Sequence, residues 1–271
     1  MPELPEVETT RAGIAPHIEQ QIVSKVIVRN PQLRWPVPAD LDNTLRNQSV
    51  RSLRRRAKYL LFEIDTGTLM IHLGMSGSMR INPIDTAIGP YDHFELQFSN
   101  GQCLRLRDPR RFGSVHFDTG DIHRHPLLAG LGPEPLSDAF NGDYLFRRSR
   151  GRRQSIKTFI MDSRIVVGVG NIYASEALFE AGIAPGRQAG KTTRPRYDRL
   201  AQAIKHTLDK AIAKGGTTLR DFTSYEGQPG YFRHELKVYD RADEACRICG
   251  DIVRVRRLGQ RSTYYCTTCQ H

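Results

Sequence analysis

Two pairs of cysteines near the end of this chain restrict its fold more than any other feature of the sequence. Cys246 and Cys249 form one C-x2-C pair, and sixteen residues separate it from the second pair, Cys266 and Cys269. This is the spacing of a zinc ribbon, in which a hairpin places four thiolates around one Zn²⁺. Because sulfur fills all four positions of such a site, none remains for a catalytic water. The spacing therefore predicts one structural zinc.

The fifth cysteine, Cys103, makes the count odd, and its alternating neighbours predict a strand in which the thiol is a small buried hydrophobic group. The first residues lack the basic and then apolar order of a signal peptide. No run of about 18 apolar residues indicates a membrane helix. We therefore expect a cytoplasmic protein.

The chain is strongly basic, with 40 Lys and Arg residues against 29 Asp and Glu, which gives a formal charge of +11 at pH 7. The excess lies in three clusters of basic side chains: Arg51, Arg54, Arg55, Arg56 and Lys58; Arg147, Arg148, Arg150, Arg152 and Arg153; and Arg254, Arg256, Arg257 and Arg261. Such clusters favour a polyanion as partner, with an ordinary solvated basic surface as the alternative. A membrane surface is disfavoured, because no segment joins a strongly apolar face to a basic one.

The first part of the chain has the two-residue period of β strands. Residues 22–29 and 49–64 read as two strands, and Leu69, Ile71 and Leu73 then alternate with other residues. This pattern predicts antiparallel β structure with half-buried strands. At 271 residues the chain is long enough for a second domain with its own core.

One hairpin allows its register to be predicted. Phe94 and Leu96 alternate before a Ser-Asn-Gly loop, and Leu104 and Leu106 alternate after it. A two-residue Asn-Gly turn would place Leu96 opposite an arginine, whereas a three-residue loop at 99–101 pairs Leu96 with Leu104 and Phe94 with Leu106. We therefore predict a type I turn followed by a glycine bulge.

Between residues 127 and 141 the pattern weakens into glycines and prolines, which predicts a hinge between two domains. Beyond it, residues 156–161, 172–181 and 200–212 have the apolar spacing of helices, and a Gly-Gly pair at 215–216 would end the last one. The second half is therefore predicted to be helical as far as the cysteines.

The first eight residues, MPELPEVE, place unusual chemistry at the chain terminus. Removal of Met1 leaves Pro2 with a secondary amine, and an α-amino group of pKa ~8 is roughly one-tenth neutral at pH 7. Such an amine is a ready nucleophile, with the carboxylate of Glu3 beside it. Pro5 suits the first turn of a helix. The apolar stripe of that helix consists of Leu4, Val7, Ile14 and Ile18. An ordinary helix start without chemistry is the alternative.

Eight segments together carry a family resemblance: MPELPEVE, RRAKYLLFE, HLGMSGS, DPRRFG, GVGNIYASEALF, GGTTLRDF, GQPGYF and the four-cysteine segment. On these motifs, and on their order, the chain resembles formamidopyrimidine-DNA glycosylase, the bacterial-type repair enzyme for oxidised purines. The resemblance extends from Met1 to Cys269 and so covers the whole chain.

The resemblance implies an α+β fold, with an N-terminal antiparallel β-sandwich, flanking helices, a helix-two-turn-helix domain, a zinc hairpin and a DNA cleft between the two halves. We place the catalytic domain at 1–130, the hinge at 131–150, the DNA-binding domain at 151–236 and the zinc-ribbon hairpin at 237–271. The implied activity is that of a glycosylase and lyase of base excision repair. The implied partner is double-stranded DNA with oxidised bases or abasic sites, bound by a monomer.

By the same resemblance, four residues have catalytic roles. Pro2 is the nucleophile, and Glu3 is the acid/base at the sugar. Lys58 is the proton donor for β-elimination, and Arg261 is the donor for δ-elimination. Because Lys58 lies in a run of arginines, an ordinary solvated phosphate contact is its alternative role.

Further residues match DNA contacts of the family. Met75, Arg110 and Phe112 resemble a wedge that fills the gap left by a flipped nucleotide, although Met75 folded back onto the sandwich is the alternative. The segment 217–231 resembles the loop that closes over the flipped base, with a plain surface loop as the alternative.

Three other positions are expected to hold the DNA backbone. Arg152 matches a basic contact, and Asn171 follows glycines that open a helix, where backbone amides attract phosphate. Asn171 as a simple N-cap is the alternative. Tyr91 occupies a position where relatives can carry histidine.

Two rival functions stay open at this point. The sister class, which acts on oxidised pyrimidines, generally differs from the Leu-Pro-Glu-Val sequence that follows Glu3. A non-enzymatic DNA-binding protein with a zinc ribbon would have no use for a free Pro2 amine beside Glu3.

Overall fold

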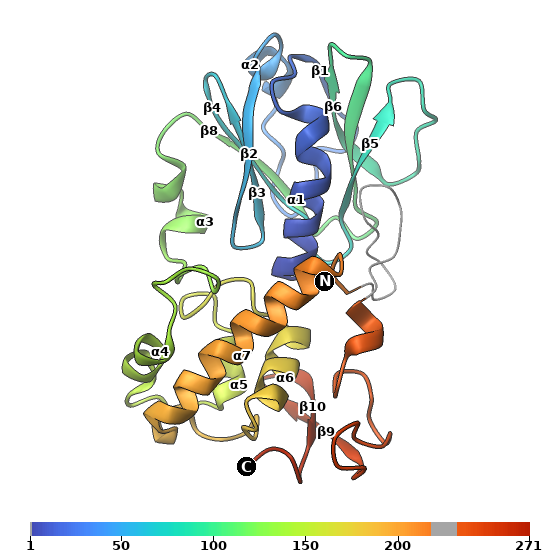
Figure 1. The fold of residues 1–271 in the computed structure, drawn as a ribbon. Coiled ribbons are helices and arrows are strands. Elements are labelled where there is room, and N and C mark those ends of the chain that lie inside the picture. Colours follow the sequence, from blue (N-terminus) through green and yellow to red (C-terminus); the bar gives the residue numbers. More distant parts are fainter. Residues whose placement is uncertain (1, 218–231) are drawn as a thin grey trace. The chain divides into compact units, whose positions relative to one another are not determined.

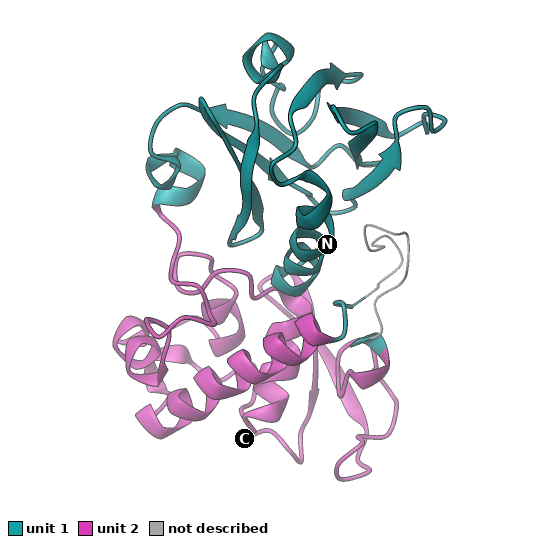
Figure 2. Ribbon diagram, turned by 45° about the horizontal axis from the view of Figure 1, so that its top comes forward, with its two compact units in different colours: residues 1–129, 214–233 teal, residues 130–213, 234–271 magenta. Residues whose placement is uncertain are grey.

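The computed structural model of the chain describes residues 2–217 and 232–271. It divides into two compact units, which Figure 2 shows in different colours. Unit 1 contains residues 1–129 and 214–233, and unit 2 contains residues 130–213 and 234–271. The chain thus leaves unit 1 after residue 129 and returns to it for twenty residues late in the sequence.

Unit 1 is built on two four-stranded antiparallel sheets (Figure 1). The first has the order β1-β6-β7-β5, with β1 at Val23–Val28, β6 at Asp92–Phe98, β7 at Gln102–Arg107 and β5 at Ser78–Pro83. The second has the order β2-β3-β4-β8, with β2 at Val50–Arg56, β3 at Tyr59–Ile64, β4 at Gly67–His72 and β8 at Ser114–Asp118. Buried side chains from both sheets form one hydrophobic core, so the predicted antiparallel sandwich is confirmed.

Helix α1 (Leu4–Ile18) packs against strands of both sheets, namely β2, β3 and β5. The predicted apolar stripe is confirmed, since Leu4, Val7, Ile14 and Ile18 are each at most 1% exposed. The remaining helical segments of the early chain are α2 (Leu41–Leu45), η1 (Ile122–Arg124) and α3 (Pro126–Ala129). The sandwich therefore holds the start of α1, where the proposed nucleophile lies, through buried side chains.

The β6–β7 hairpin has the predicted register. Phe94 pairs with Leu106 and Leu96 with Leu104, and all four side chains are fully buried. Gly101 has a φ of +81°, the left-handed conformation that a glycine bulge requires. Cys103 is also fully buried, as its neighbours indicated.

The prediction of one long strand over 49–64 is wrong. The segment is two strands, β2 and β3, joined by a tight turn at Ala57 and Lys58. Ala57 has a φ of +54°, which a residue with a side chain adopts reluctantly, so no glycine or asparagine marks the turn in the sequence. The half-buried pattern is also wrong for the centre of this sheet, because Leu61 and Met70, outside the sandwich core, are 4% and 0% exposed.

Unit 2 contains the predicted helices. They are α5 (Ile156–Ile160), α6 (Asn171–Glu180) and α7 (Arg194–Ala213), together with α4 (Gly142–Ser149) and the short helix η2 (Ala189–Lys191). α7 packs against α4 and α6, and the Gly-Gly pair that follows it has left-handed φ angles of +74° and +80°.

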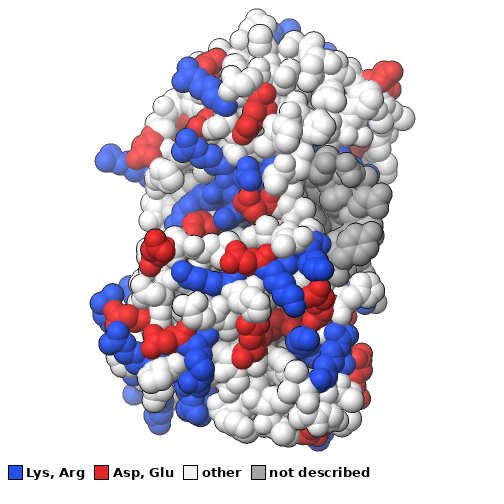
Figure 3. Space-filling model, in the orientation of Figure 1, with Lys and Arg blue, Asp and Glu red and all other residues white. Residues whose placement is uncertain are grey.

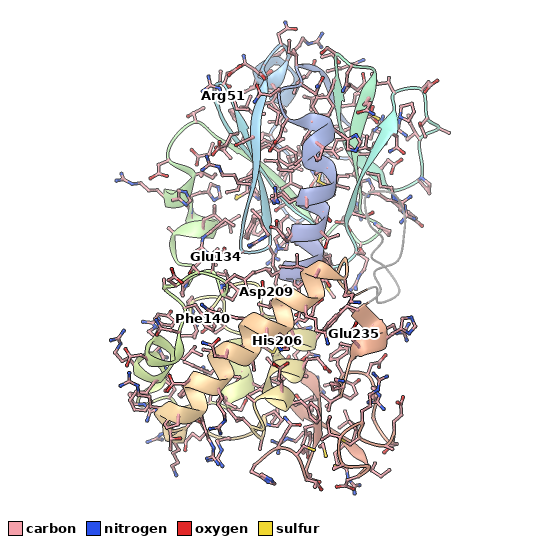
Figure 4. All side chains as sticks on the ribbon, in the orientation of Figure 1. Arg51, Glu134, Phe140, His206, Asp209 and Glu235 are labelled. Carbon is pink, nitrogen blue, oxygen red and sulfur yellow. The ribbon has the colours of Figure 1, made fainter. Side chains whose placement is uncertain are left out.

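The segment 131–150, expected to be a hinge, contains α4 and two fully buried hydrophobic side chains, Phe140 and Leu145. Phe140 lies beside α4 in Figure 4. The glycines and prolines at 130–135 precede this helix and masked its short amphipathic pattern. The second part of the segment is thus packed structure in unit 2.

The four-cysteine segment forms the predicted hairpin, β9 (Val253–Leu258) paired with β10 (Arg261–Cys266). Its two-residue turn, Gly259 and Gln260, has φ angles of +52° and +60°, which match the type I′ turn of tight hairpins. The short helix η3 (Phe232–Glu235) precedes the hairpin. Glu235, labelled in Figure 4, forms an ion pair with Lys210 on α7 at 2.8 Å. Within the described ranges, no helix has the length and apolar character needed to cross a membrane.

Candidate active site and nucleic-acid interface

The proposed catalytic terminus is buried and held by hydrogen bonds. Pro2 and Glu3 are buried at the start of α1, with Glu3 2% exposed. The Glu3 backbone N–H donates to Glu6 Oε2 at 2.8 Å, and the Thr217 N–H donates to Glu6 Oε1 at 2.7 Å. The buried Glu6 carboxyl therefore joins the first turn of α1 to Thr217, which follows α7 in the chain.

This contact requires a glycine before Thr217. Gly216 has a φ of +80°, and a Cβ at this position would lie 3.0 Å from Glu6 Oε1. The rest of the predicted base-closing loop, residues 218–231, lies outside the described residues, as does Met1. Glu6 was not singled out by sequence reasoning, because a glutamate in the first turn of a helix is common.

Lys58 lies in the β2–β3 turn rather than within a strand, and its side chain is partly exposed. The turn is joined to α1 through Arg55, whose Nε donates to Glu8 Oε2 at 2.8 Å. Another nitrogen of the same guanidinium donates to the carbonyl of Ala57 at 2.9 Å. The structure therefore links the Lys58 turn to α1, the helix that directly follows Pro2 and Glu3.

His72, at the end of β4, is a polar site residue that sequence reasoning missed. Its Nδ1 accepts the backbone N–H of Gly74 at 2.9 Å, and its ring lies 4.7 Å from the ring of Tyr59. Burial of the ring, helped by the nearby charges of Lys58 and Arg34, lowers the pKa of His72 to about 4. His72 is therefore a neutral acceptor at pH 7, and it fixes the backbone just before Met75.

The proposed wedge residues lie in two loops that touch each other. The backbone of Gly74, beside Met75, packs so closely against Phe112 and Gly113 that a Cβ would collide with them, and Gly74 has a φ of +67°. Phe112 is 42% exposed, and the Arg110 guanidinium lies 4.9 Å from the centre of its ring. Met75 is partly exposed. An aromatic ring, a cation and a flexible apolar side chain are thus presented together.

Tyr91, the departure from the family pattern, is 40% exposed. The Arg107 guanidinium lies 5.3 Å from the centre of its ring. A cation over an aromatic face is an attractive contact, so Arg107 helps to hold the ring of Tyr91. A DNA contact by Tyr91 stays a prediction.

Asn171 is not an N-cap, so that alternative is wrong. Gly170 caps α6, and Asn171 is the first helical residue. Its Oδ1 accepts from Lys157 Nζ at 2.6 Å, and its Nδ2 donates to the Ser262 carbonyl at 3.0 Å. The side chain therefore joins α5, α6 and β10.

Lys157 is the third residue that sequence reasoning missed, since a lysine on a short helix gives no pattern of burial. Its side chain is fully buried. Besides Asn171, its ammonium donates to the Ser262 carbonyl at 3.0 Å and to Thr263 Oγ1 at 2.9 Å. These contacts hold the residues that follow the exposed Arg261 at the start of β10. The other proposed phosphate contact, Arg152, is exposed in the loop between α4 and α5.

The four cysteines of the hairpin form a cluster whose Sγ atoms all lie within 4.8 Å of one another. Cys246 and Cys269 have their sulfurs 3.9 Å apart, and those of Cys249 and Cys266 are 3.5 Å apart. A tetrahedral Zn²⁺ with bonds of about 2.3 Å separates its sulfurs by about 3.8 Å, so the cluster fits this metal. The prediction of one structural zinc is confirmed.

Basic side chains lie at the surface of both units. Figure 3 shows lysine and arginine interleaved with aspartate and glutamate on the face it presents. Several exposed arginines form local ion pairs, such as Arg51 with Asp65 at 2.6 Å. The charge of +11 is therefore not displayed as one uniform patch on this face.

Models of three protein domains match successive parts of the chain. They are the formamidopyrimidine-DNA glycosylase N-terminal domain at residues 1–115, the formamidopyrimidine-DNA glycosylase H2TH domain at 131–223, and the zinc finger found in FPG and IleRS at 243–271. Among curated relatives, formamidopyrimidine-DNA glycosylase of Idiomarina loihiensis is 55% identical over 270 residues, with all of both chains covered. The same protein of Alkalilimnicola ehrlichii is 57% identical over 276 residues, again with all of both chains covered.

Solved structures agree with this assignment. The MutM (Fpg) protein from Thermus thermophilus is 37% identical, with a TM-score of 0.89 over 99% of this chain and 98% of that one. A Lactococcus lactis Fpg mutant in complex with Fapy-dG DNA is 30% identical, with a TM-score of 0.93 over both full chains. The chain therefore belongs to the formamidopyrimidine-DNA glycosylase family.

Proposed function

We propose that this protein is a bifunctional DNA glycosylase and AP lyase of base excision repair. It removes oxidised purines, including 8-oxoguanine and formamidopyrimidines, and then cleaves the strand at the abasic site. The observation that carries this proposal is the identity of 55% or more, over the full chain, to curated formamidopyrimidine-DNA glycosylases. Solved relatives were captured with Fapy-dG, 8-oxo-G and abasic-site DNA, which supports the same substrates here.

In the proposed reaction, the Pro2 nitrogen forms a bond to C1′ of the damaged nucleoside. The base departs with the electron pair of the glycosidic bond and takes up a proton. Glu3 assists at the sugar, where O4′ gains a proton and the ring opens to an iminium between Pro2 and C1′. The iminium makes the C2′ proton acidic, because the electrons left behind delocalise onto its nitrogen.

The two eliminations follow from the iminium. Loss of the C2′ proton expels the 3′ phosphate with the electron pair of the C3′–O bond, and Lys58 is the proposed proton donor. Loss of a further sugar proton then expels the 5′ phosphate, with Arg261 as the proposed donor. Water finally hydrolyses the iminium and releases Pro2.

The proposed DNA contacts fall into two groups: residues that bind the phosphate backbone and residues that assist base flipping. Arg152 and Asn171 hold the backbone, Tyr91 extends this contact, and Arg110 belongs to the wedge beside Phe112. Met75 and Phe112 fill the gap in the stack when the damaged nucleotide leaves the helix, a step that costs a few kcal/mol. Cys246, Cys249, Cys266 and Cys269 would hold the zinc, which fixes the hairpin that carries Arg261.

We also propose that the division made from the sequence describes function. Residues 1–130 supply catalysis, 151–236 grip DNA and 237–271 form the zinc hairpin, with 131–150 connecting them. The burial of Phe140 and Leu145 refines this division, because it places α4, at the end of the connecting segment, with the helical domain. The protein is proposed to act as a monomer on DNA in the cytoplasm.

One experiment tests the proposal against both rivals. Duplexes carrying 8-oxoguanine, an oxidised pyrimidine or an abasic site are incubated with the protein and borohydride. We expect covalent trapping on the abasic duplex and faster excision of 8-oxoguanine than of the pyrimidine. The absence of trapping would favour a non-enzymatic binder, and faster pyrimidine excision would favour the sister class.

A further inference from the structure

Three separate segments of unit 1 meet at one buried residue, Asp108. Its side chain is fully buried. Oδ1 accepts the hydroxyl of Ser76 at 2.9 Å, and Oδ2 accepts the backbone N–H of Gly113 at 2.7 Å. Its own backbone N–H donates to the Tyr91 carbonyl at 3.0 Å. The partners are adjacent to, or identical with, the proposed DNA contacts Met75, Phe112 and Tyr91.

The backbone carbonyl of Asp108 completes this junction. It accepts the N–H of Arg111 at 3.1 Å and lies 3.0 Å from His93 Nε2, which must be the donor because a carbonyl only accepts. Arg111 has a φ of +56°, so the loop that carries Arg110 and Phe112 is held in a strained backbone conformation. Asp108 therefore holds three segments: the Met75 loop, the loop that carries Arg110 and Phe112, and the residues just before β6.

Asp108 is held in an unusual way for a buried acidic side chain. Among the residues that the structure describes, its oxygens accept from a hydroxyl and a backbone amide, and no basic side chain forms an ion pair with it. Burying an acidic side chain without a cationic partner costs free energy, which within the described part of the chain only the two hydrogen bonds offset. A Cβ at Gly113 would lie 3.0 Å from Oδ2, so the backbone approaches closely on this side as well.

We propose that Asp108 is a positioning residue that makes the Met75 loop and the Phe112 loop act as one wedge. The proposal rests on the proposed function, because it deepens the account of how the damaged nucleotide is flipped. Two independent loops would each have to be ordered when they enter the stack, and each would lose conformational entropy at that moment. Held together by Asp108, both loops are ordered before DNA binds.

The first test uses Ser76→Ala, which removes one arm of the junction and leaves the carboxylate and the Gly113 contact in place. We expect excision of 8-oxoguanine from a paired duplex to slow about tenfold, the typical effect of one lost hydrogen bond to a buried charged group. Strand cleavage at a preformed abasic site should change less than about twofold, because less stacking is lost there.

Ser114→Ala is the matched control. The Ser114 hydroxyl is fully buried in the same unit and has no hydrogen-bond partner among the described residues. The substitution therefore removes a hydroxyl oxygen, as Ser76→Ala does, but leaves the hydrogen bonds of Asp108 in place. The rates of 8-oxoguanine excision and of abasic-site cleavage should both stay at the wild-type values. Equal slowing on both substrates in Ser76→Ala would overturn the positioning role, and so would a wild-type excision rate.

A second pair of variants separates geometry from charge. In Asp108→Asn the remaining oxygen can accept from Gly113, and the new amide can donate to the Ser76 hydroxyl, so the junction persists without a charge. We expect Asp108→Asn to excise paired 8-oxoguanine within about threefold of wild type, and Asp108→Ala to be far slower. Equal impairment of the two variants would overturn the proposal.

A double-mutant cycle measures the coupling itself. Met75→Ala and Phe112→Ala should affect excision non-additively in wild type and additively in the Ser76→Ala background. If the effects of Met75→Ala and Phe112→Ala are equally non-additive in the Ser76→Ala background, the role of Asp108 is overturned, although the proposed enzymatic activity is unaffected. Failure of the wild-type protein to trap or excise would instead reject the proposed function, so the two failures are distinguishable.

Discussion

Pro2 and Glu3 are buried at the first turn of α1, and this placement makes the chemistry of the terminus testable one residue at a time. Pro2→Gly, or a tag that blocks the terminus, should abolish the borohydride-trapped complex. Binding of lesion DNA should stay within about tenfold, because phosphate contacts supply most of the affinity. Trapping and a gel-shift titration measure the two effects. Full trapping by a protein that mass spectrometry shows to retain Met1 would contradict the assignment.

The role of Glu3 leads to a separate expectation. Glu3→Gln keeps the size of the side chain and removes its acid/base function. Excision of 8-oxoguanine should be lost, while some β-elimination remains on a preformed abasic site. Both activities are measured on matched duplexes, and the assigned role is wrong if both survive unchanged.

His72 predicts a pH dependence of stability. Its pKa of about 4 in the folded protein lies below the ordinary value near 6.5, so the unfolded chain binds a proton first as the pH falls. The free energy of unfolding therefore decreases as the pH falls from about 6.5 to about 4. At pH 4.5 it should be lower than at pH 7 by on the order of 2 kcal/mol. Below this range the acceptor for the Gly74 N–H is also lost.

Urea unfolding between pH 4.5 and 7.5 checks this expectation. His72→Asn is the control, because its Oδ1 can replace Nδ1 as the acceptor and does not titrate. The wild-type protein should lose more stability than His72→Asn when the pH is lowered. Parallel pH profiles would show that His72 is not the titrating group.

At the scale of the element, the zinc hairpin should unfold without unfolding the sandwich. Cys249→Ser, or removal of zinc by a chelator, should disorder β9 and β10 and weaken DNA binding, because metal binding supplies folding free energy to such small elements. The sandwich should stay folded on its own core. Metal analysis and hydrogen exchange measure the two outcomes, and active protein without stoichiometric zinc would contradict the prediction.

Two β hairpins show what the sequence can and cannot predict about an element. The β6–β7 register followed from apolar alternation and a glycine, because only one loop length placed Leu96 opposite Leu104. The β2–β3 turn was missed, because Ala57 adopts its left-handed conformation without any turn residue in the sequence. Here the pairing of the two strands outweighs local preference.

At the scale of the whole molecule, phosphate grip and base flipping should respond to different variants. Arg152→Ala should weaken binding of damaged and undamaged DNA about equally and make the salt slope shallower by roughly one unit. Met75→Ala should leave the slope unchanged and slow excision most on a fully paired duplex. Fluorescence titrations at several salt concentrations, with single-turnover rates, measure both. A changed slope in Met75→Ala would contradict the wedge.

Much of the fold could be predicted from periodicity, and the family from motifs, while the roles of the site residues stay predictions. The contacts that hold the site could not, because they join residues far apart in sequence. Lys157 and Thr263, or Asp108 and Ser76, show no pattern until the chain has folded. Buried polar groups of this kind are specified by tertiary geometry rather than by local composition.

The contact between Glu6 and Thr217 spans 211 residues, and this separation has a consequence for the order of events during synthesis. At roughly 5–20 residues per second, Thr217 emerges about 10–40 seconds after Glu6. During that interval the carboxyl of Glu6 lacks the hydrogen bond from the Thr217 N–H, so the first turn of α1 is not yet joined to that residue. Pro2 is buried in the finished protein, so we expect the initiator methionine to be trimmed on the ribosome. The newborn chain would then complete its active terminus only as its last fifth is made.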